Sequence, residues 1–227
     1  MSTLLLVLGS LVAAEFIGYW LHVLLHSAAI PALSKAHMNH HLLSYAPWTD
    51  QRRGGEDYIQ EVADGHVLIA GLGLEWIIPS VILIALVAGV EWLIGLSWTQ
   101  IVISEVTIMV YCAFLFWWLH DRMHVKGHWL LNNKLFRKRF LRSRKFHDIH
   151  HHHVNDKGLM QKNYGIAFPF FDHVFGTYQA KLDGTNKEGI EAAYRRYNIT
   201  PANFPVERGV RSWDSARREH ASDEAPR

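Results

Sequence analysis

Residues 4–26 read LLLVLGSLVAAEFIGYWLHVLLH, an apolar run that ends in two histidines four positions apart. At about 1.5 Å of rise per residue, a helix of this length crosses a hydrocarbon layer of roughly 30 Å. Residues 67–90 and 101–119 form two further apolar runs of spanning length. The sequence therefore predicts an all-α fold, a transmembrane helical bundle of about three spans. A cleavable signal peptide is the alternative for residues 1–26, but that stretch lacks a basic residue and a small-residue cleavage site.

The cations indicate how such a bundle is oriented. Of the 227 residues, 23 are Lys or Arg, and all of them lie within residues 35–53 or 122–227. Because loops rich in Lys and Arg stay in the cytoplasm, we expect residues 91–100 and the N-terminus to face outward. We therefore expect a multi-pass integral membrane protein whose histidine-rich cap and C-terminus are cytoplasmic.

Histidines carry the clearest chemical signal in the chain. Ten of the 16 histidines fall into four short boxes. The boxes are His22 and His26; His37, His40 and His41; His120 and His124; and His147, His150 and His151. Residues three or four apart share a helix face, so each box presents its imidazoles in one direction. Under the expected topology, all four boxes reach the same cytoplasmic membrane face.

The type and number of ligands narrow the choice of metal. Imidazole suits zinc, copper, iron or nickel, and the single cysteine excludes a thiolate cage. One zinc ion takes three or four protein ligands, so about ten imidazoles indicate two metal ions. Four of the other histidines, His66, His128, His173 and His220, lack a box partner and are expected to be structural or surface residues.

Carboxylates near metal-bound imidazoles can accept their hydrogen bonds and orient the rings. Asp121 and Asp148 each follow a box histidine directly, and helix capping is the alternative role for them. Asn163 and Asp172 are further candidates, and Asp172 can accept hydrogen bonds either from a ligand imidazole or from a turn. Within the first span, Glu15 can line a substrate tunnel or form a hydrogen bond between helices.

Residues 125–146 mix large apolar side chains with eight Lys and Arg residues. This pattern is typical of a helix in the lipid headgroup region, and a solvated helix packed on its own domain is the alternative. Further on, residues 187–197 are expected to form one short helix, whereas residues 212–227 are too charged to fold alone.

At these boxes the chain resembles the fatty acid hydroxylase/sterol desaturase superfamily of integral-membrane histidine-box enzymes. The more specific part is the ending His147-Asp148-Ile149-His150-His151, then Asn163-Tyr164-Gly165, then Asp172 to Thr177 in the pattern DxxFGT. The resemblance covers roughly residues 15–178. His152 and His153 follow this ending directly, so a set of ligands that uses His150 and His153 remains open. The set His147, His150 and His151 reproduces the family pattern.

The resemblance implies a non-haem di-iron centre held by the ten box histidines, with no catalytic residue outside it. It also implies O2-dependent hydroxylation or desaturation of a lipid, with a fatty-acyl or sterol-like substrate preferred. Since no nucleotide- or flavin-binding motif is evident, electrons are expected from a ferredoxin- or cytochrome b5-like carrier and its reductase. Residues 137–145 can dock such an acidic carrier, although membrane phospholipid is an equally good partner for these cations. No nucleic-acid partner is expected.

Three alternatives remain open: a carotenoid hydroxylase of the same mechanism, a histidine-rich membrane metal transporter, and a zinc-dependent lipid hydrolase. By domains, we expect residues 1–178 to form the membrane-embedded domain with its cytosolic cap. Residues 179–211 would be a partly helical extension, and residues 212–227 a disordered tail.

Overall fold

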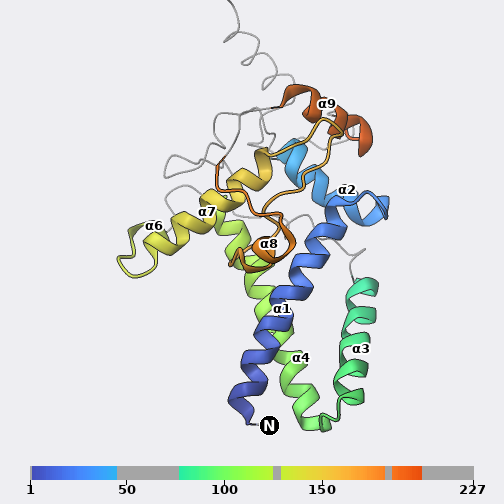
Figure 1. Ribbon diagram of the computed structural model, residues 1–227, viewed down its shortest axis with the longest axis vertical. Coiled ribbons are helices and arrows are strands. Elements are labelled where there is room, and N and C mark those ends of the chain that lie inside the picture. The colour runs from blue at the N-terminus through green and yellow to red at the C-terminus, as the bar shows by residue number, and fades with distance from the viewer. Residues whose placement is uncertain (1, 45–76, 125–128, 182–185, 201–227) are drawn as a thin grey trace, which may run out of the picture.

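The computed structural model describes residues 2–44, 77–124, 129–181 and 186–200. Every regular element within these ranges is a helix, which confirms the predicted all-α fold. Figure 1 shows long helices side by side at one end and shorter helices gathered at the other. The long helices, here called the stem, are α1 (Thr3–His26), α3 (Ile77–Leu93) and α4 (Trp98–Ala113). The cap contains α2 (Pro31–Asn39), α7 (Arg137–His152), α8 (Phe170–Phe175) and α9 (Lys187–Arg196).

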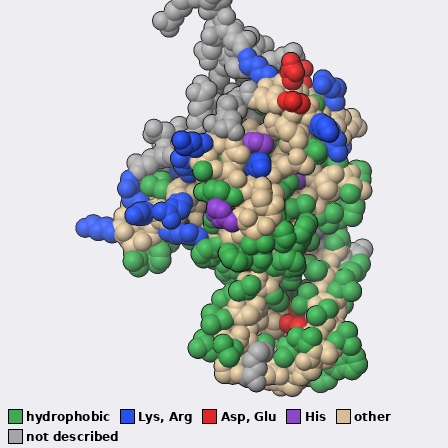
Figure 2. Space-filling model, in the orientation of Figure 1, with side chains coloured by type: hydrophobic (Ala, Val, Ile, Leu, Met, Phe, Trp, Pro, Cys, Tyr) green, Lys and Arg blue, Asp and Glu red, His purple; other side chains and the backbone are tan. Residues whose placement is uncertain are grey.

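The surface of the stem is apolar. Val81, Leu86 and Val110 are 60%, 62% and 65% exposed, and Figure 2 shows hydrophobic side chains covering this end of the molecule. A contiguous apolar surface of this kind marks contact with lipid or with another protein. Residues Thr3–His26 and Trp98–Phe116 are long and apolar enough to cross a membrane, while α3 contributes the shorter apolar stretch Pro79–Leu93. Residues 67–76, the expected beginning of the second span, lie outside the described residues.

Small and polar residues bring α1 and α4 together. Ser10 Oγ lies 2.7 Å from Ser104 Oγ, and Tyr111 donates a hydrogen bond to Glu15 Oε1 at 2.6 Å. A Cβ atom on Gly18 would lie 3.3 Å from the ring of Phe116, so the glycine permits this close approach. Glu15 is therefore an acceptor between helices, which is one of the two roles expected for it.

A tight turn joins α3 to α4 at the end of the stem away from the cap. Gly95 adopts a φ of +87°, a conformation that favours glycine. Ser97 then caps α4: its hydroxyl accepts from Gln100 N, while the Gln100 side chain accepts from Ser97 N. The connection predicted at residues 91–100 is thus a short helical hairpin.

Two π-helical segments precede or contain histidine boxes. α4 continues into η6 (Phe114–Leu119) and then α5 (His120–Met123), where the His120 N–H donates to the Leu115 carbonyl five residues back. The second box begins in α2 and continues into η1 (His40–Ser44). A π-helical turn is wider than an α-helical one and often occurs at functional sites. Both segments therefore alter the direction in which neighbouring side chains project.

The expectation of one helix over residues 125–146 is wrong for the part that the structure describes. α6 (Trp129–Asn132) ends before Asn133, whose Oδ1 accepts from the backbone N–H groups of Leu135 and Phe136. Asparagine favours such turns because its side chain competes with helical hydrogen bonds. The following helix, α7, begins at Arg137 and continues through the fourth histidine box, while residues 125–128 are not described.

α9 agrees closely with the helix expected at residues 187–197, and it packs on the cap. Asn186 Oδ1 accepts from Gly189 N at its start. A hydrophobic core joins α9 to the rest of the cap, through Met38, Leu42, Val154, Met160, Ile190, Ala193 and Tyr194. Tyr197 donates a hydrogen bond to the carbonyl of His26, and Tyr194 donates to the carbonyl of Leu42. This helix therefore buttresses the first two histidine boxes.

Replacing Gly158 with alanine should destabilise the cap. Its φ is +74°, and a Cβ atom there would lie 2.4 Å from the backbone nitrogen of Ala193 in α9. Left-handed strain and the clash together should lower the free energy of unfolding by about 2 kcal/mol or more. The thermal unfolding midpoint measures this effect. Gly9→Ala is the control, because nothing lies within 4 Å of its added Cβ. Equal midpoints for the two variants would contradict the packing described for α9.

Candidate metal centre

Ten buried histidines form two compact groups where the stem meets the cap, and they are the ten box residues. The first histidine group contains His22, His26, His37, His41 and His150. The second histidine group contains His40, His120, His124, His147 and His151. Within each group, one ring nitrogen from every residue lies within 4.8 Å of the others. The structure thus brings together segments separated by more than one hundred positions in the sequence.

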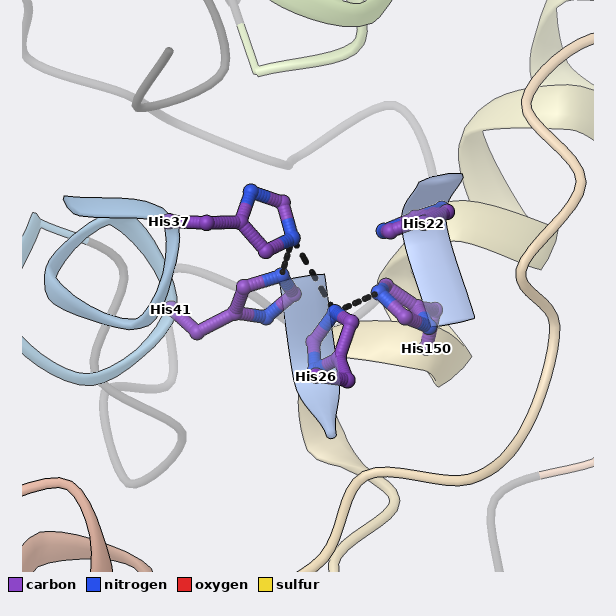
Figure 3. A group of neighbouring side chains, drawn as sticks. All are labelled: His22, His26, His37, His41 and His150. Atoms are coloured by element: carbon purple, nitrogen blue, oxygen red, sulfur yellow. Dashed lines mark hydrogen bonds between the residues drawn. The ribbon is translucent and has the colours of Figure 1, made fainter. Parts of the chain in front are cut away.

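Three segments supply the first histidine group. Figure 3 shows His22 and His26 from α1, His37 and His41 from α2 and η1, and His150 from α7, with their rings converging. The Nε2 atom of His26 lies 3.0 Å from that of His37 and 3.1 Å from that of His150. Another 3.1 Å contact joins His37 Nε2 to His41 Nε2. All five rings thus present nitrogen to one small volume.

The second histidine group repeats this arrangement with residues from η1, from α5 and the turn that follows it, and from α7. His147 Nε2 lies 3.0 Å from the Nε2 atoms of both His124 and His151. The ring of His40 approaches those of His120 and His124, with centroids 4.8 and 4.9 Å apart. Like the first group, this one is closed off from solvent, since each of its five side chains is buried.

In two pairs of consecutive histidines, one residue belongs to each group. His40 belongs to the second group and His41 to the first, while His150 belongs to the first and His151 to the second. Consecutive residues on a helix project about 100° apart, so each pair reaches in two directions. The rings of His41 and His151 stack with centroids 4.0 Å apart, which places the two groups side by side.

The geometry of the nitrogens fits a pair of metal ions. Two nitrogens bound at right angles to one ion, with bonds of about 2.1 Å, lie about 3.0 Å apart, close to the observed separations. His22 Nε2 is buried and has no hydrogen-bond partner among the residues that the structure describes. A buried nitrogen without a partner is costly, and a cation among these atoms would satisfy it.

Protonation of these imidazoles is strongly disfavoured, which keeps lone pairs available for a metal. Burial lowers the pKa of His41, His147 and His151 well below the usual range, and neighbouring imidazoles add to this effect. For His150, burial lowers the pKa to about 4, although the hydrogen bond to the Lys162 carbonyl opposes the shift. These four imidazoles are therefore held in the neutral form.

Two backbone carbonyls orient imidazoles of the first group. His22 Nδ1 donates to the carbonyl of Tyr164 at 2.5 Å, and His150 Nδ1 donates to the carbonyl of Lys162 at 2.6 Å. Donation from Nδ1 fixes the tautomer and leaves Nε2 as the metal-facing atom. Residue types did not identify these two carbonyls as acceptors. The Asn163-Tyr164-Gly165 motif, which contains Tyr164 and directly follows Lys162, was the sequence signal that pointed to this loop.

Asn163 ties the carbonyl-bearing loop to its neighbours. Its φ of +58° turns the chain, and its side-chain Nδ2 donates to the carbonyls of Phe146 and Gln179. The Gln179 N–H donates back to Asn163 Oδ1 at 2.7 Å. Asn163 lies between the two acceptor carbonyls, so it positions the ligands through the backbone.

Asp172 acts on the same loop. Its carboxylate accepts from Tyr164 N at 2.7 Å, Gly165 N at 2.8 Å and Thr177 Oγ1 at 2.7 Å. Of the two roles expected for it, the structure thus shows the turn, and Asp172 supports the Tyr164 carbonyl that orients His22. Gly165 is required here because a Cβ atom would lie 2.4 Å from the carbonyl oxygen of Phe168.

Asp148 and the histidines after the fourth box lie beside the two groups. His152 Nδ1 donates to the backbone carbonyl of Asp148 at 2.9 Å and lies 3.6 Å from its carboxylate. Neither His152 nor His153 belongs to a group, so the arrangement agrees with the register His147, His150 and His151. The side chain of Asp121 lies outside what the structure describes.

The remaining histidines agree with the expectation where they can be compared. His173 is exposed and stacks on Tyr178 with ring centroids 3.9 Å apart, away from both groups. His66, His128 and His220 lie outside the described residues.

The family model for fatty acid hydroxylases matches residues 7–177 of the chain. This match contains all four boxes, the Asn163-Tyr164-Gly165 motif and the ending at Thr177, and it confirms the resemblance that those motifs carry. No curated protein and no solved structure matches the chain significantly.

The metal-free protein should lose stability as the pH falls from about 6.5 to 4. Unfolding returns the histidines to a pKa near 6.5, whereas that of folded His150 is about 4. In this window the unfolded chain binds more protons, so the free energy of unfolding decreases on acidification. Unfolding midpoints of chelator-treated protein across this range measure the effect. A midpoint independent of pH would contradict the burial of neutral imidazoles.

Replacing Asp172 with alanine should weaken metal retention without removing a ligand. Loss of the carboxylate frees the Tyr164 and Gly165 N–H groups, so the carbonyl that orients His22 loses its support. Loss of such a supporting partner typically costs about 10- to 100-fold in metal affinity. Competition with a chelator measures this, with Asp156→Ala as the exposed control. Identical metal affinities in the two variants would show that the loop does not orient the ligands.

Proposed function

Because the chain belongs to the fatty acid hydroxylase family, we propose that it is a membrane-bound, non-haem di-iron enzyme that hydroxylates or desaturates a lipid. The observation that carries this proposal is the division of ten buried imidazoles into two adjacent groups of five. A zinc hydrolase needs only three or four protein ligands. Five neutral nitrogen donors per group suit iron, and cysteine thiolate is absent from both groups.

Bound iron would supply the redox chemistry that activates O2 and oxidises an unactivated C–H bond. Hydroxylation balances when R–H, O2, two electrons and two protons give R–OH and water. The residues of the chain hold the ions, orient His22 and His150 through backbone carbonyls, and exclude water by burying the rings. Desaturation removes a second hydrogen from the neighbouring carbon, and the same residues serve it.

An apolar substrate fits the position of the groups directly above the stem. His22 and His26 lie in the last turns of α1. α4 continues through η6 into α5, which contains His120. A lipid chain lying along the apolar stem can therefore approach the histidines without crossing water. This supports a fatty-acyl or sterol-like substrate, with a carotenoid as the alternative of the same mechanism.

The proposed topology has three spans, an outward N-terminus, and a cytoplasmic cap and C-terminus. Two apolar helices and the family support a membrane protein. Trp92 and Trp98, 59% and 72% exposed, flank the hairpin at one end of the stem, while Trp20, 45% exposed, lies near the other end of α1. Tryptophan favours both membrane interfaces, which supports a stem that spans the hydrocarbon layer.

We propose that the electrons come from a ferredoxin- or cytochrome b5-like carrier with its reductase. The reaction consumes two electrons, and the sequence has no evident nucleotide- or flavin-binding motif that would supply them. A metal transporter is less well supported. A transit path for metal ions would distribute ligands along the stem. Both histidine groups instead lie at one end of the stem, and the acidic residues deeper in α1 and α4 are Glu15 and Glu105.

Metal content and lipid products test the proposal together. Purified protein should contain about two iron ions per chain, and His41→Ala and His124→Ala should each remove iron and abolish turnover. His173→Ala should retain both, because that ring stacks on Tyr178 outside the groups. Mass spectrometry of lipids from cells expressing each variant should reveal a gain of one oxygen or a loss of two hydrogens with the active forms. One tightly bound zinc would indicate a hydrolase, and readily exchanging metal would indicate a transporter.

A further inference from the structure

A cavity of about 430 Å³ lies against α7, beside the segment that leads into α8 and the segment that follows it. Arg139, Arg142 and Lys145 supply its cations, and Phe146, Ile149 and Tyr178 supply apolar lining. Among the residues that the structure describes, no acidic one lines it. Its chemistry therefore suits a ligand with an anionic group beside an apolar part.

Arg139 is held at the edge of this cavity. Its guanidinium donates to the carbonyl of Ala167 and lies 4.3 Å from the centre of the Phe168 ring. A cation restrained in this way loses less side-chain freedom on binding an anion than a solvated one does. Arg142 and Lys145 follow on the same helix, and both are exposed.

Large apolar side chains surround the cations on this surface. Phe168 and Phe170 are 48% and 62% exposed beside the cavity, and Leu135 and Phe136 are 78% and 48% exposed at the start of α7. Figure 2 shows the Lys and Arg side chains gathered at the α6–α7 end of the cap, next to the hydrophobic surface of the stem. Alternation of cations with exposed apolar residues is typical of a surface in the headgroup region.

The position of α8 places this surface at the junction of stem and cap. Phe175 stacks on Tyr19 of α1 with ring centroids 5.1 Å apart, and Phe171 lies 5.4 Å from Phe16. These α1 residues precede His22 by one or two turns. The cavity is therefore near the level at which the apolar stem ends, which is where phosphate groups of a bilayer would lie.

We infer that this cavity binds the phosphate headgroup of an anionic membrane lipid, with Arg139, Arg142 and Lys145 around the phosphate and Phe168 and Phe170 against the acyl chains. An acidic electron carrier is the other partner considered for these cations. It would not require a concave apolar lining or exposed phenylalanines among the charges. Binding of the lipid does not depend on turnover, so this inference stands apart from the proposed function.

Native mass spectrometry of delipidated, metal-loaded protein tests the inference. Wild-type protein should retain phosphatidylglycerol in preference to phosphatidylcholine. Arg142→Gln combined with Lys145→Gln should weaken phosphatidylglycerol binding about tenfold or more, because two charge-assisted contacts are lost. The matched control is Lys157→Gln with Arg195→Gln, which removes the same charge from exposed positions elsewhere on the cap. Both double variants should keep the wild-type unfolding midpoint.

Three results would overturn the inference. Equal losses in the two double variants would mean that only net charge attracts the lipid. Displacement by inorganic phosphate at equal concentration would assign the cavity to free phosphate. Unchanged phosphatidylglycerol binding in Arg142→Gln with Lys145→Gln, together with weaker binding of an acidic ferredoxin, would assign the surface to an electron carrier.

Discussion

The central constraint on this protein is the burial of ten imidazoles in two groups, within each of which the ring nitrogens lie within 4.8 Å of one another and some pairs are only 3.0 Å apart. Without a cation between them, facing lone pairs on such nitrogens repel one another, and His22 Nε2 is buried with no hydrogen-bond partner among the described residues. Protonation does not relieve this, since burial and neighbouring imidazoles hold the pKa values of His41, His147 and His151 well below the usual range. A metal ion bound in each group would therefore also stabilise the fold of the cap.

Several parts of the fold stabilise this arrangement. The loop with Asn163 and Asp172 holds two carbonyls against His22 and His150, and Tyr197 of the C-terminal segment donates to the carbonyl of His26. The stem anchors the first and third boxes at the ends of α1 and α4. For the proposed oxidation of a lipid, a buried site at the end of an apolar stem would combine exclusion of water with access for a substrate that water does not dissolve.

The sequence by itself determined the all-α class, the apolar stem and the ten histidines of the two groups, because helical spacing and apolar runs are local properties. It also carried the family, through motifs that lie close together in the chain. By contrast, the turn at Asn133 divided a segment expected to be one helix. A pattern of apolar and basic residues alone did not reveal that break, because it depends on one side chain bonding to backbone N–H groups.

Only the tertiary structure decided how the histidines are shared. Two pairs of consecutive histidines, His40–His41 and His150–His151, are each divided between the groups. This division depends on how η1 and α7 are oriented against α1 and α5, and spacing within the sequence does not encode that orientation. The tertiary structure also decided that the carbonyls of Lys162 and Tyr164 accept hydrogen bonds from imidazoles. Every residue carries a backbone carbonyl, so residue type does not indicate which carbonyls act as acceptors. For Asp172 the sequence left two acceptor roles open, toward a ligand imidazole or within a turn, and folding decides for the turn because it brings Tyr164 and Gly165 to the carboxylate.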